Sequence, residues 1–279
     1  MLLTAHQLDR FSQDGFIKGP KVVGADALTS LRGELARVIA DQGKPAIPQP
    51  TAIGNLSGDP THPVWQIVNI WEASEPFWQL LNIPGLGATI QSLIGGTEIR
   101  LWHDQIQYKP EGTGGVNAWH QDWPYWPTMS VPNAVTAWIA IDDADQANGC
   151  MSMVPGSHLW GNAINHLHSI KDFHQMPPEY QGHTTVAQLC PVEAGAVHFH
   201  HSLTWHGSRA NTSTRPRRAI ALHFMNETVL KNGDAHLCSK YCEGKDGETI
   251  RGEHFPLIWK DGKAVAVETP RWMLAGSRA

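Results

Sequence analysis

The stretch Trp119-His120-Gln121-Asp122-Trp123-Pro124-Tyr125 contains a His-x-Asp pair, which is half of a possible metal site. Residues i and i+2 of a β-strand point to the same face of the sheet. The imidazole of His120 and the carboxylate of Asp122 could therefore approach one divalent ion from a single rigid element. The same pattern occurs by chance in many chains, so other segments have to supply the rest of the site.

Further histidines occur in the segment Ala196-Val197-His198-Phe199-His200-His201-Ser202-Leu203-Thr204-Trp205-His206-Gly207-Ser208. In a strand, His198 and His200 would share one face and His201 would point away. His206 lies at the expected strand end, where a side chain can lean out towards a ligand. Taken singly, each is more often a hydrogen-bonded core or surface residue. One of them, however, would complete a two-histidine, one-carboxylate triad, which is typical of non-haem iron(II) oxygenases.

The composition is that of a globular protein with many turns. The chain has 279 residues, 41% of them hydrophobic and 17% charged, which allows one large domain or two small ones. Its 26 glycines and 19 prolines favour an all-β or α+β protein. The net charge is −5 and no block of Lys and Arg occurs apart from residues 215–218, which argues against a nucleic-acid-binding surface. The 16 histidines and 12 tryptophans crowd near residues 102–126 and 198–206, as a metal site in an aromatic pocket would require.

The N-terminus lacks a basic segment followed by an apolar run, and no apolar stretch approaches the length of a membrane span. We therefore expect no signal peptide and no membrane span. The four cysteines, Cys150, Cys190, Cys238 and Cys242, lack the spacing of a disulfide framework, which favours the reducing cytoplasm. Cys238 and Cys242 could bind zinc together with His236. Two free thiols in a polar loop are favoured instead, since no second ligand pair follows at the spacing of a zinc finger.

The hydrophobic pattern predicts helices in the first third of the chain. One helix begins with a capping box at Thr4-Ala5-His6-Gln7 and ends near Gly15. A second carries an apolar stripe from Leu28 to Ile39 and stops by Gly43. Further helical segments are expected over 74–82 and 85–94. Residues 43–63, which are rich in Pro and Gly, are expected to be irregular and are a candidate lid.

Strands follow the helices. They are expected over 98–109, 134–141, 151–154, 184–189, 196–199 and 219–224, with a last hairpin of 257–259 and 264–267 about Asp261-Gly262. Residues 158–183 are read as an insertion near the mouth of a pocket, and residues 226–253 as loop. Helices followed by many short strands predict a closed double sheet of the jelly-roll type.

Three motifs occur together: His120-Gln121-Asp122, Pro155-Gly156-Ser157-His158, and His206-Gly207-Ser208 with Arg217 eleven positions after His206. In combination they resemble the phytanoyl-CoA dioxygenase family of Fe(II)/2-oxoglutarate oxygenases, over about residues 5–225. The resemblance implies a mainly β protein with flanking helices around a double-stranded β-helix (jelly-roll, cupin-like) core. It implies one domain over residues 1–279, with helices in 4–94, the core in about 97–225 and a C-terminal extension in 226–279.

The resemblance also implies that three side chains bind the iron: His120, Asp122 and His206. This donor set leaves three positions open, two for 2-oxoglutarate and one for O₂. The distal carboxylate of 2-oxoglutarate would lie in a low-dielectric barrel and would need a fixed cation, for which the guanidinium of Arg217 is suited. Arg217 rather than Arg218 should point inward, because neighbours on a strand face opposite ways. Arg215, the rival of the same parity, precedes Pro216 and should lie in the turn.

Four more residues match or neighbour positions that often contact the cosubstrate in this family. Ser208 follows the second histidine ligand by two residues, and Trp138 lies on an expected strand. Gln105 and Gln107 would lie nearby on the strand over 98–109. Because both glutamines share the inward face of that strand, the sequence does not decide which one reaches 2-oxoglutarate.

These features predict a 2-oxoglutarate-dependent dioxygenase that hydroxylates an unactivated C–H bond of a small molecule, with release of succinate and CO₂. The carboxylate of Asp122 favours hydroxylation, because related halogenases carry a small residue at that position. One alternative is desaturation, cyclisation or demethylation by the same iron chemistry. Another is a non-redox, cupin-like metal-binding protein that uses His198, His200 and His206. We expect a monomer or homodimer with no nucleic-acid or membrane partner.

Aromatic residues near the motifs are candidates for the substrate wall: Trp102, Trp119, Trp123, Tyr125, Trp126 and Trp160. For at least half of them, packing is the expected role. An aromatic wall would favour an apolar ring or a cationic amine. The absence of an obvious basic patch in the sequence favours a free small molecule over a substrate carried on coenzyme A.

Overall fold

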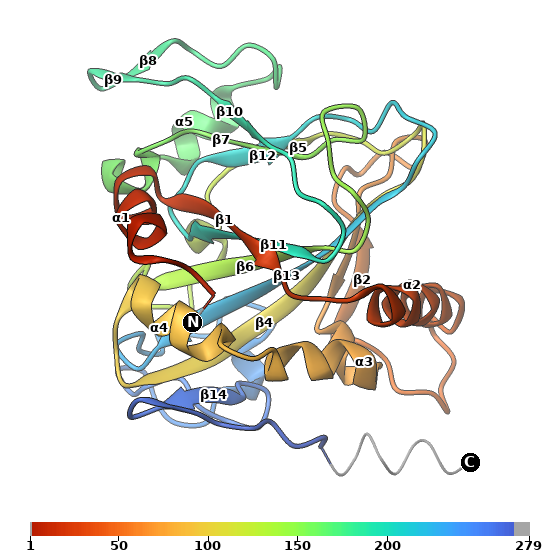
Figure 1. The fold of residues 1–279 in the computed structure, drawn as a ribbon, viewed down its shortest axis with the longest axis vertical. Coiled ribbons are helices and arrows are strands. Elements are labelled where there is room, and N and C mark those ends of the chain that lie inside the picture. Colours follow the sequence, from red (N-terminus) through yellow and green to blue (C-terminus); the bar gives the residue numbers. More distant parts are fainter. Residues whose placement is uncertain (1, 271–279) are drawn as a thin grey trace.

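Two antiparallel β-sheets lie face to face and enclose the interior of the protein (Figure 1). The computed structural model describes residues 2–270. The larger sheet contains, in spatial order, β1 (Phe16–Lys21), β11 (Ala196–His201), β6 (Ala134–Ala140), β13 (Arg217–Asn226), β4 (Glu98–Lys109), β14 (Leu257–Lys260) and β15 (Lys263–Ala264), with β3 (Trp65–Val68) also paired to β4 and β2 (Ala52–Asn55) to β3. The smaller sheet contains β10 (Gln188–Cys190), β7 (Met151–Met153), β12 (His206–Ser208) and β5 (Asn117–His120), and β8 (Glu179–Tyr180) pairs with β9 (His183–Thr184). The predicted jelly-roll fold is confirmed.

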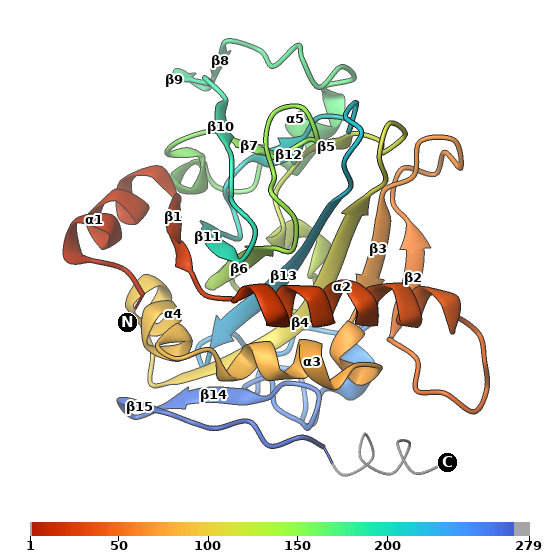
Figure 2. The same ribbon diagram turned by 45° about the vertical axis from the view of Figure 1, so that its right-hand side comes forward.

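Helices pack on the face of the larger sheet that points away from the smaller one (Figure 2). On this face lie α1 (Ala5–Asp14), α2 (Ala25–Ala40), α3 (Glu75–Trp78) and α4 (Leu86–Ile94), with the short turns η1 (Ile70–Glu72) and η2 (Gln79–Asn82). In contrast, α5 (Ile164–Ser169) packs against Trp119 and Trp205 beside the smaller sheet. The other short turns are η3 (Trp123–Tyr125), η4 (Ser157–Trp160) and η5 (Ser239–Tyr241). Leu31 and Leu35 of α2 belong to one buried cluster with Ile220 and Leu222 of β13. Burial of such side chains is the main force that holds the helices on the sheet.

The side chains of β13 that alternate with these face the smaller sheet, where their surroundings are different. Ala219 and Ala221 pack in a cluster with Met151 and Met153 of β7. Arg217 and His223 lie on the same inward face and are also buried. Because residues of one parity share a face, the two alanines lie between Arg217 and His223 on the inward side of β13.

Local sequence signals predict the first helices well. In α1, the Thr4 hydroxyl accepts a hydrogen bond from the Gln7 backbone, and the Gln7 side chain accepts one from the Thr4 backbone, so the capping box is present. The helix ends at Gly15, which has φ of 81°, a conformation that favours glycine. The predicted stripe of α2 is buried, and the segment over 74–82 is helical but divides into α3 and η2.

Two expectations are wrong. Residues 43–63 are not irregular throughout, because residues 52–55 form β2 and pair with β3. The pairing is between segments of four residues each, too short to stand out among the surrounding prolines. Residues 184–189 are not one strand. The chain leaves β9 at Thr185, whose backbone N–H donates to the Pro178 carbonyl at 3.0 Å, and pairs with β7 only from Gln188.

The segment after β13 closes one end of the interior. Residues 226–253 are mostly loop, as predicted, with the short turn η5. Val229 and Ile250 of this segment, with Phe255 after it, pack against Trp102 and Trp126. The predicted hairpin of β14 and β15 is present, with positive φ of 46° at Asp261 and 83° at Gly262, although its second strand is shorter than expected. Within residues 2–270, none of the helices combines the length and apolar character needed to cross a bilayer.

A buried acid joins the helical layer to the C-terminal segment. Glu72 is 7% exposed, and its carboxylate accepts hydrogen bonds from Thr51 Oγ1 at 2.9 Å and Asn69 Nδ2 at 3.0 Å. Nε2 of His254 lies 3.5 Å from the same carboxylate oxygen. Burial raises the pKa of Glu72 to about 7, against the opposing effect of these hydrogen bonds.

Replacing Glu72 with Gln should stabilise the fold at high pH. The pKa of Glu72 is higher in the folded than in the unfolded chain, so its contribution is present at low pH and is lost as the pH rises through about 7. Glu72→Gln keeps an acceptor without charge, and should raise the free energy of unfolding by about 2 kcal/mol at pH 8 but little at pH 5. Urea titration measures both values. The exposed Glu75→Gln is the control, and an equal effect at the two pH values would contradict this account.

Candidate metal centre

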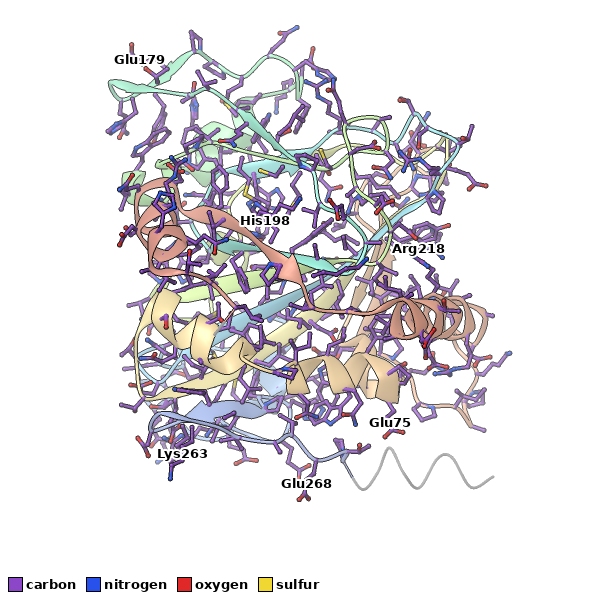
Figure 3. All side chains as sticks on the ribbon, in the orientation of Figure 1. Glu75, Glu179, His198, Arg218, Lys263 and Glu268 are labelled. Atoms are coloured by element: carbon purple, nitrogen blue, oxygen red, sulfur yellow. The ribbon has the colours of Figure 1, made fainter. Side chains whose placement is uncertain are left out.

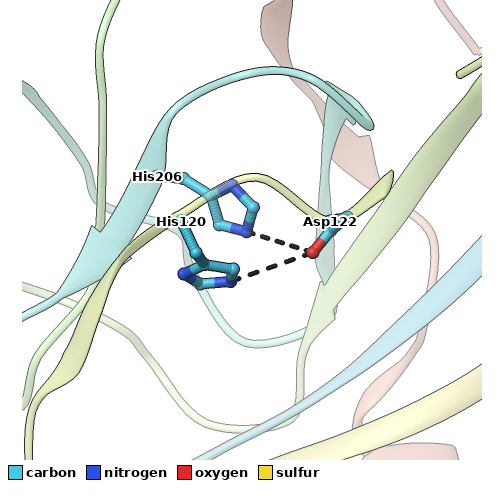
Figure 4. Close-up of side chains that lie close together, drawn as sticks. All are labelled: His120, Asp122 and His206. Atoms are coloured by element: carbon cyan, nitrogen blue, oxygen red, sulfur yellow. Dashed lines mark ion pairs between the residues drawn. The ribbon is translucent and has the colours of Figure 1, made fainter. Parts of the chain in front are cut away.

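Two histidines and one aspartate meet where β5 and β12 lie side by side in the smaller sheet. His120 is the last residue of β5, His206 is the first of β12, and the two are direct cross-strand partners. Asp122 follows two residues later, and its Oδ1 lies 3.8 Å from Nε2 of His120 and 3.5 Å from Nε2 of His206 (Figure 4). The three ligand atoms lie within 4.8 Å of one another, and no other such group of His, Cys, Asp or Glu occurs in the described residues.

The main chain orients both imidazoles. Nδ1 of His120 lies 2.8 Å from the Ala118 carbonyl oxygen, and Nδ1 of His206 lies 2.9 Å from the Thr204 carbonyl oxygen. A carbonyl only accepts, so each Nδ1 carries the proton and donates it. Each Nε2 then has a free lone pair directed towards Asp122, as a metal ligand requires.

The second oxygen of Asp122 is held from the larger sheet. Oδ2 accepts a hydrogen bond from Thr136 Oγ1 at 3.0 Å and one from His200 Nε2 at 3.2 Å. Thr136 Oγ1 also lies 2.8 Å from Nδ1 of His223. Thr136 and His223 were not predicted from the sequence, and His200 was considered only as an alternative ligand. Their signal is a polar residue at a fully buried strand position, because such a residue needs a partner.

The protonation states of the three residues suit a divalent cation. Burial lowers the pKa of His120 to about 3, so the ring is neutral at pH 7. Burial also lowers the pKa of His206, but the carboxylate of Asp122 outweighs this effect and raises it above the usual value. Burial opposes ionisation of Asp122, yet the imidazoles of His206, His200 and His223 hold its pKa well below the usual range. The ring of His120 is thus neutral and the carboxylate of Asp122 ionised, and a metal would displace the proton that Asp122 favours on His206. Together the three residues are the donor set of non-haem iron centres.

A buried cation that has no acidic partner in the described part of the chain lies between the sheets. Arg217, the first residue of β13, is fully buried, and its Cζ lies 5.7 Å from the centre of the Trp138 ring. Its Nη2 donates to Ser208 Oγ at 3.4 Å, whereas Nε has no hydrogen-bond partner among the described residues. Burial lowers the pKa of this guanidinium to about 10, which still leaves it charged at pH 7. A buried cation without a carboxylate partner fits an anionic ligand.

The neighbouring arginines point elsewhere. Arg218 lies beside α2 (Figure 3) and forms two hydrogen bonds with Asp142, at 2.7 and 2.8 Å. Arg215 is exposed and pairs with Asp145. Arg217 thus points inward and Arg218 outward, as expected from the alternation of side chains along a strand.

The inward face of β4 lies next to Arg217. Gln105, Gln107 and Lys109 are the cross-strand partners of Ala221, Ala219 and Arg217. Both glutamines are half-buried, so their position in the sheet does not decide which one would contact a ligand. Nζ of the buried Lys109 donates to the carbonyl oxygens of Ser208, at 3.1 Å, and Arg209, at 2.5 Å. This end of the interior thus holds two buried basic groups, and burial together with the Arg217 guanidinium lowers the pKa of Lys109 well below its usual value.

Comparison with known proteins identifies the family. The family model described as phytanoyl-CoA dioxygenase (PhyH) matches residues 11–219. The chain belongs to the phytanoyl-CoA dioxygenase family. The peroxisomal phytanoyl-CoA dioxygenase of Bos taurus is 25% identical over 276 residues, which are 93% of this chain and 77% of that protein. The ectoine dioxygenase of Halomonas elongata is 30% identical over 230 residues, which are 77% of this chain and 68% of that protein.

Solved structures of similar fold include enzymes of different activities. The α-ketoglutarate-dependent carbocyclase SnoK of nogalamycin biosynthesis has a TM-score of 0.72 at 23% identity, covering 91% of this chain and 96% of that one. EctD from S. alaskensis, solved with 2-oxoglutarate and 5-hydroxyectoine, has a TM-score of 0.67 at 20% identity, covering 84% of this chain and 80% of that one. At these identities the similarity establishes the fold.

The aromatic candidates divide between packing and the site of this PhyH-family chain. Trp119 stacks on Phe173 and Trp160 packs against Trp205, both in a cluster with α5, and Trp102 stacks on Phe255. These three are packing residues. The second group comprises Tyr125 with its ring 6.2 Å from His120, Trp126 with its ring 4.8 Å from His223, and the half-buried Trp123.

The two alternative metal sites gain no support from the geometry. His198 shares the inward face with His200, as expected, and their ring centres are 6.3 Å apart, but His198 does not join the group of ligand atoms. Cys238 and Cys242 are free thiols. Neither cysteine forms a ligand group with His236 in the described part of the chain.

Metal binding at this centre should weaken as the pH falls. The pKa of His206 is raised by Asp122, and a proton on Nε2 competes with the metal for the same lone pair. Titration with Co(II) should therefore give a larger apparent Kd at pH 6 than at pH 8, with His120 neutral at both. An apparent Kd that does not change over this range would contradict the assignment of His206 as a ligand.

Proposed function

We propose that this protein is an Fe(II)/2-oxoglutarate-dependent dioxygenase that hydroxylates an unactivated C–H bond of a small molecule, with release of succinate and CO₂. The observation that carries the proposal is the convergence of His120, Asp122 and His206 where β5 and β12 pair. These residues would hold the iron, which supplies O₂ activation when bound. Membership of the PhyH family supports the same chemistry.

The buried cation supports 2-oxoglutarate as cosubstrate. Its distal carboxylate would pair with Arg217, with Ser208 and Trp138 beside the guanidinium and Gln105 or Gln107 on the neighbouring strand. Buried charges in proteins are normally paired, and Arg217 has no acidic partner among the described residues. A relative supports the assignment, since EctD was solved with 2-oxoglutarate.

The protein's own residues position the reactants and exclude water. Ala219, Ala221 and Trp138 give the interior an apolar wall between the metal ligands and the guanidinium. In such a wall, the attraction between a carboxylate and Arg217 is stronger than in water. The main-chain carbonyls of Ala118 and Thr204 keep both histidine ligands in the required tautomer.

Hydroxylation is the favoured outcome because the metal ligand set is complete. Asp122 supplies the carboxylate that chloride would have to replace in a halogenase. The ectoine dioxygenases and EctD, with its bound 5-hydroxyectoine, support hydroxylation. The alternative is ring closure or epimerisation of a small molecule by the same iron chemistry. The fold similarity to a carbocyclase and to the epimerase SnoN supports it.

Succinate formation tests the chemistry. The protein should convert 2-oxoglutarate to succinate with Fe(II), and a panel of small metabolites should reveal the substrate as the compound that accelerates this turnover. Asp122→Ala should abolish succinate formation, because the remaining histidines cannot hold the iron in the required geometry. The surface variant Asp145→Ala is the control. Full turnover by Asp122→Ala would refute the triad.

Arg217 and Arg218 provide a matched pair for the cosubstrate site. Arg217→Ala should raise the KM for 2-oxoglutarate on the order of 100-fold, because it leaves a buried carboxylate unpaired. Arg218→Ala, whose side chain points outward to Asp142, should leave that KM close to the wild-type value. Equal KM values for the two variants would exclude Arg217 as the partner of the distal carboxylate.

A further inference from the structure

A row of polar side chains crosses the larger sheet opposite the metal ligands. His200 of β11 is the cross-strand partner of Thr136 of β6, and Thr136 is in turn the partner of His223 of β13. All three are nearly fully buried, with exposed fractions of 2%, 0% and 4%. They share the inward face of neighbouring strands, so they point towards the smaller sheet and Asp122.

The hydrogen bonds of this row have one consistent direction. An ionised carboxylate only accepts, so both Thr136 Oγ1, at 3.0 Å, and His200 Nε2, at 3.2 Å, must donate to Oδ2 of Asp122. The Thr136 hydroxyl has a single proton, which is directed to Asp122. His223 must therefore donate its Nδ1 proton to Thr136 Oγ1, at 2.8 Å. The result is a chain from His223 through Thr136 to Asp122, with His200 as a second donor.

The two oxygens of Asp122 thus have separate roles. Oδ1 is the atom near the two histidine ligands, at 3.5 Å from His206 and 3.8 Å from His120. Oδ2 is turned to the larger sheet and is saturated by two charge-assisted hydrogen bonds. The backbone N–H of Asp122 donates to the Ser202 carbonyl at 2.9 Å, which fixes the residue from a third direction.

We propose that Thr136 and His200 are positioning residues for the metal: they hold Oδ2 of Asp122 away from it, so that the carboxylate binds through Oδ1 alone. His223 supports Thr136 in this role. A carboxylate that bound through both oxygens would occupy one of the positions needed for 2-oxoglutarate or O₂. This inference rests on the proposed function, because it presupposes a metal at His120, Asp122 and His206.

Co(II) binding to the purified protein tests the proposal without turnover. The visible absorption of bound Co(II) reports its coordination number, and titration gives its Kd. Thr136→Val removes the hydroxyl at nearly constant shape, and His200→Leu removes the second donor. Each should weaken Co(II) binding about 10- to 100-fold and change the absorption spectrum. The two losses should not be additive, since both act through Oδ2.

Conservative variants separate positioning from general damage. Thr136→Ser keeps the hydroxyl, and the amide of His200→Gln can replace the Nε2 donor, so both should restore most of the affinity and the wild-type spectrum. His198→Leu is the matched control, because His198 is equally buried on the same face of β11 but makes no hydrogen bond to Asp122. Thermal unfolding of each apoprotein checks that the variant is folded. If His200→Leu does not fold, the result for Thr136→Val decides the test.

The outcomes distinguish this inference from the proposed function. Wild-type affinity and spectrum in Thr136→Val, together with loss of Co(II) binding in Asp122→Ala, would overturn the positioning role and leave the metal centre intact. Failure of the wild-type protein to bind Co(II) would overturn both. Weakened binding with an altered spectrum in Thr136→Val, restored in Thr136→Ser, is the result that we expect.

Discussion

The carboxylate of Asp122 is the place where polar side chains from both sheets of this protein meet. A buried carboxylate is costly unless its lone pairs are satisfied, and here both sheets satisfy them. The smaller sheet brings His120 and His206 to one oxygen, and the larger sheet brings Thr136 and His200 to the other. Polar contacts at Asp122 therefore join the two sheets, in addition to their apolar packing.

The close approach of β5 and β12 sets the geometry of the histidines. Gly207 lies between His206 and Ser208, and a Cβ at this position would lie 2.9 Å from the Asn117 carbonyl oxygen. A side chain would therefore push the two strands apart and move His206 away from His120. The same short strand carries Ser208, whose hydroxyl accepts from Arg217. One strand of three residues thus links the metal ligands to the buried guanidinium.

The interior is polar at two ends for different reasons. Near Arg217 it carries a buried positive charge with no acidic partner among the described residues, which suits an anionic cosubstrate. Near Asp122 it carries imidazoles around one negative charge, which suits a cation. The alanines of β13 lie between these two regions and pack in a cluster with Met151 and Met153. The inward-facing residues of β13 therefore place the buried guanidinium and the surroundings of Asp122 at different positions along one strand.

The sequence predicts what depends on local pattern. The capping box of α1 and the stripe of α2 are each visible within a few residues, and both are present. β4 spans the predicted residues, although it is buried over most of its length instead of alternating. The pairing of β2 with β3 was missed because each strand has only four residues and prolines surround them. The inward parity of Arg217 follows from the strand itself. The partners of Asp122 could not be read in this way, since Thr136, His200 and His223 approach it only when two sheets close over each other.

A crystal structure grown without oxygen, with Fe(II) and 2-oxoglutarate present, tests the central claim most directly. The account predicts iron bound by Nε2 of His120, Nε2 of His206 and one oxygen of Asp122, with the distal carboxylate of 2-oxoglutarate against Arg217. Iron bound at other residues, or 2-oxoglutarate bound away from Arg217, would contradict it.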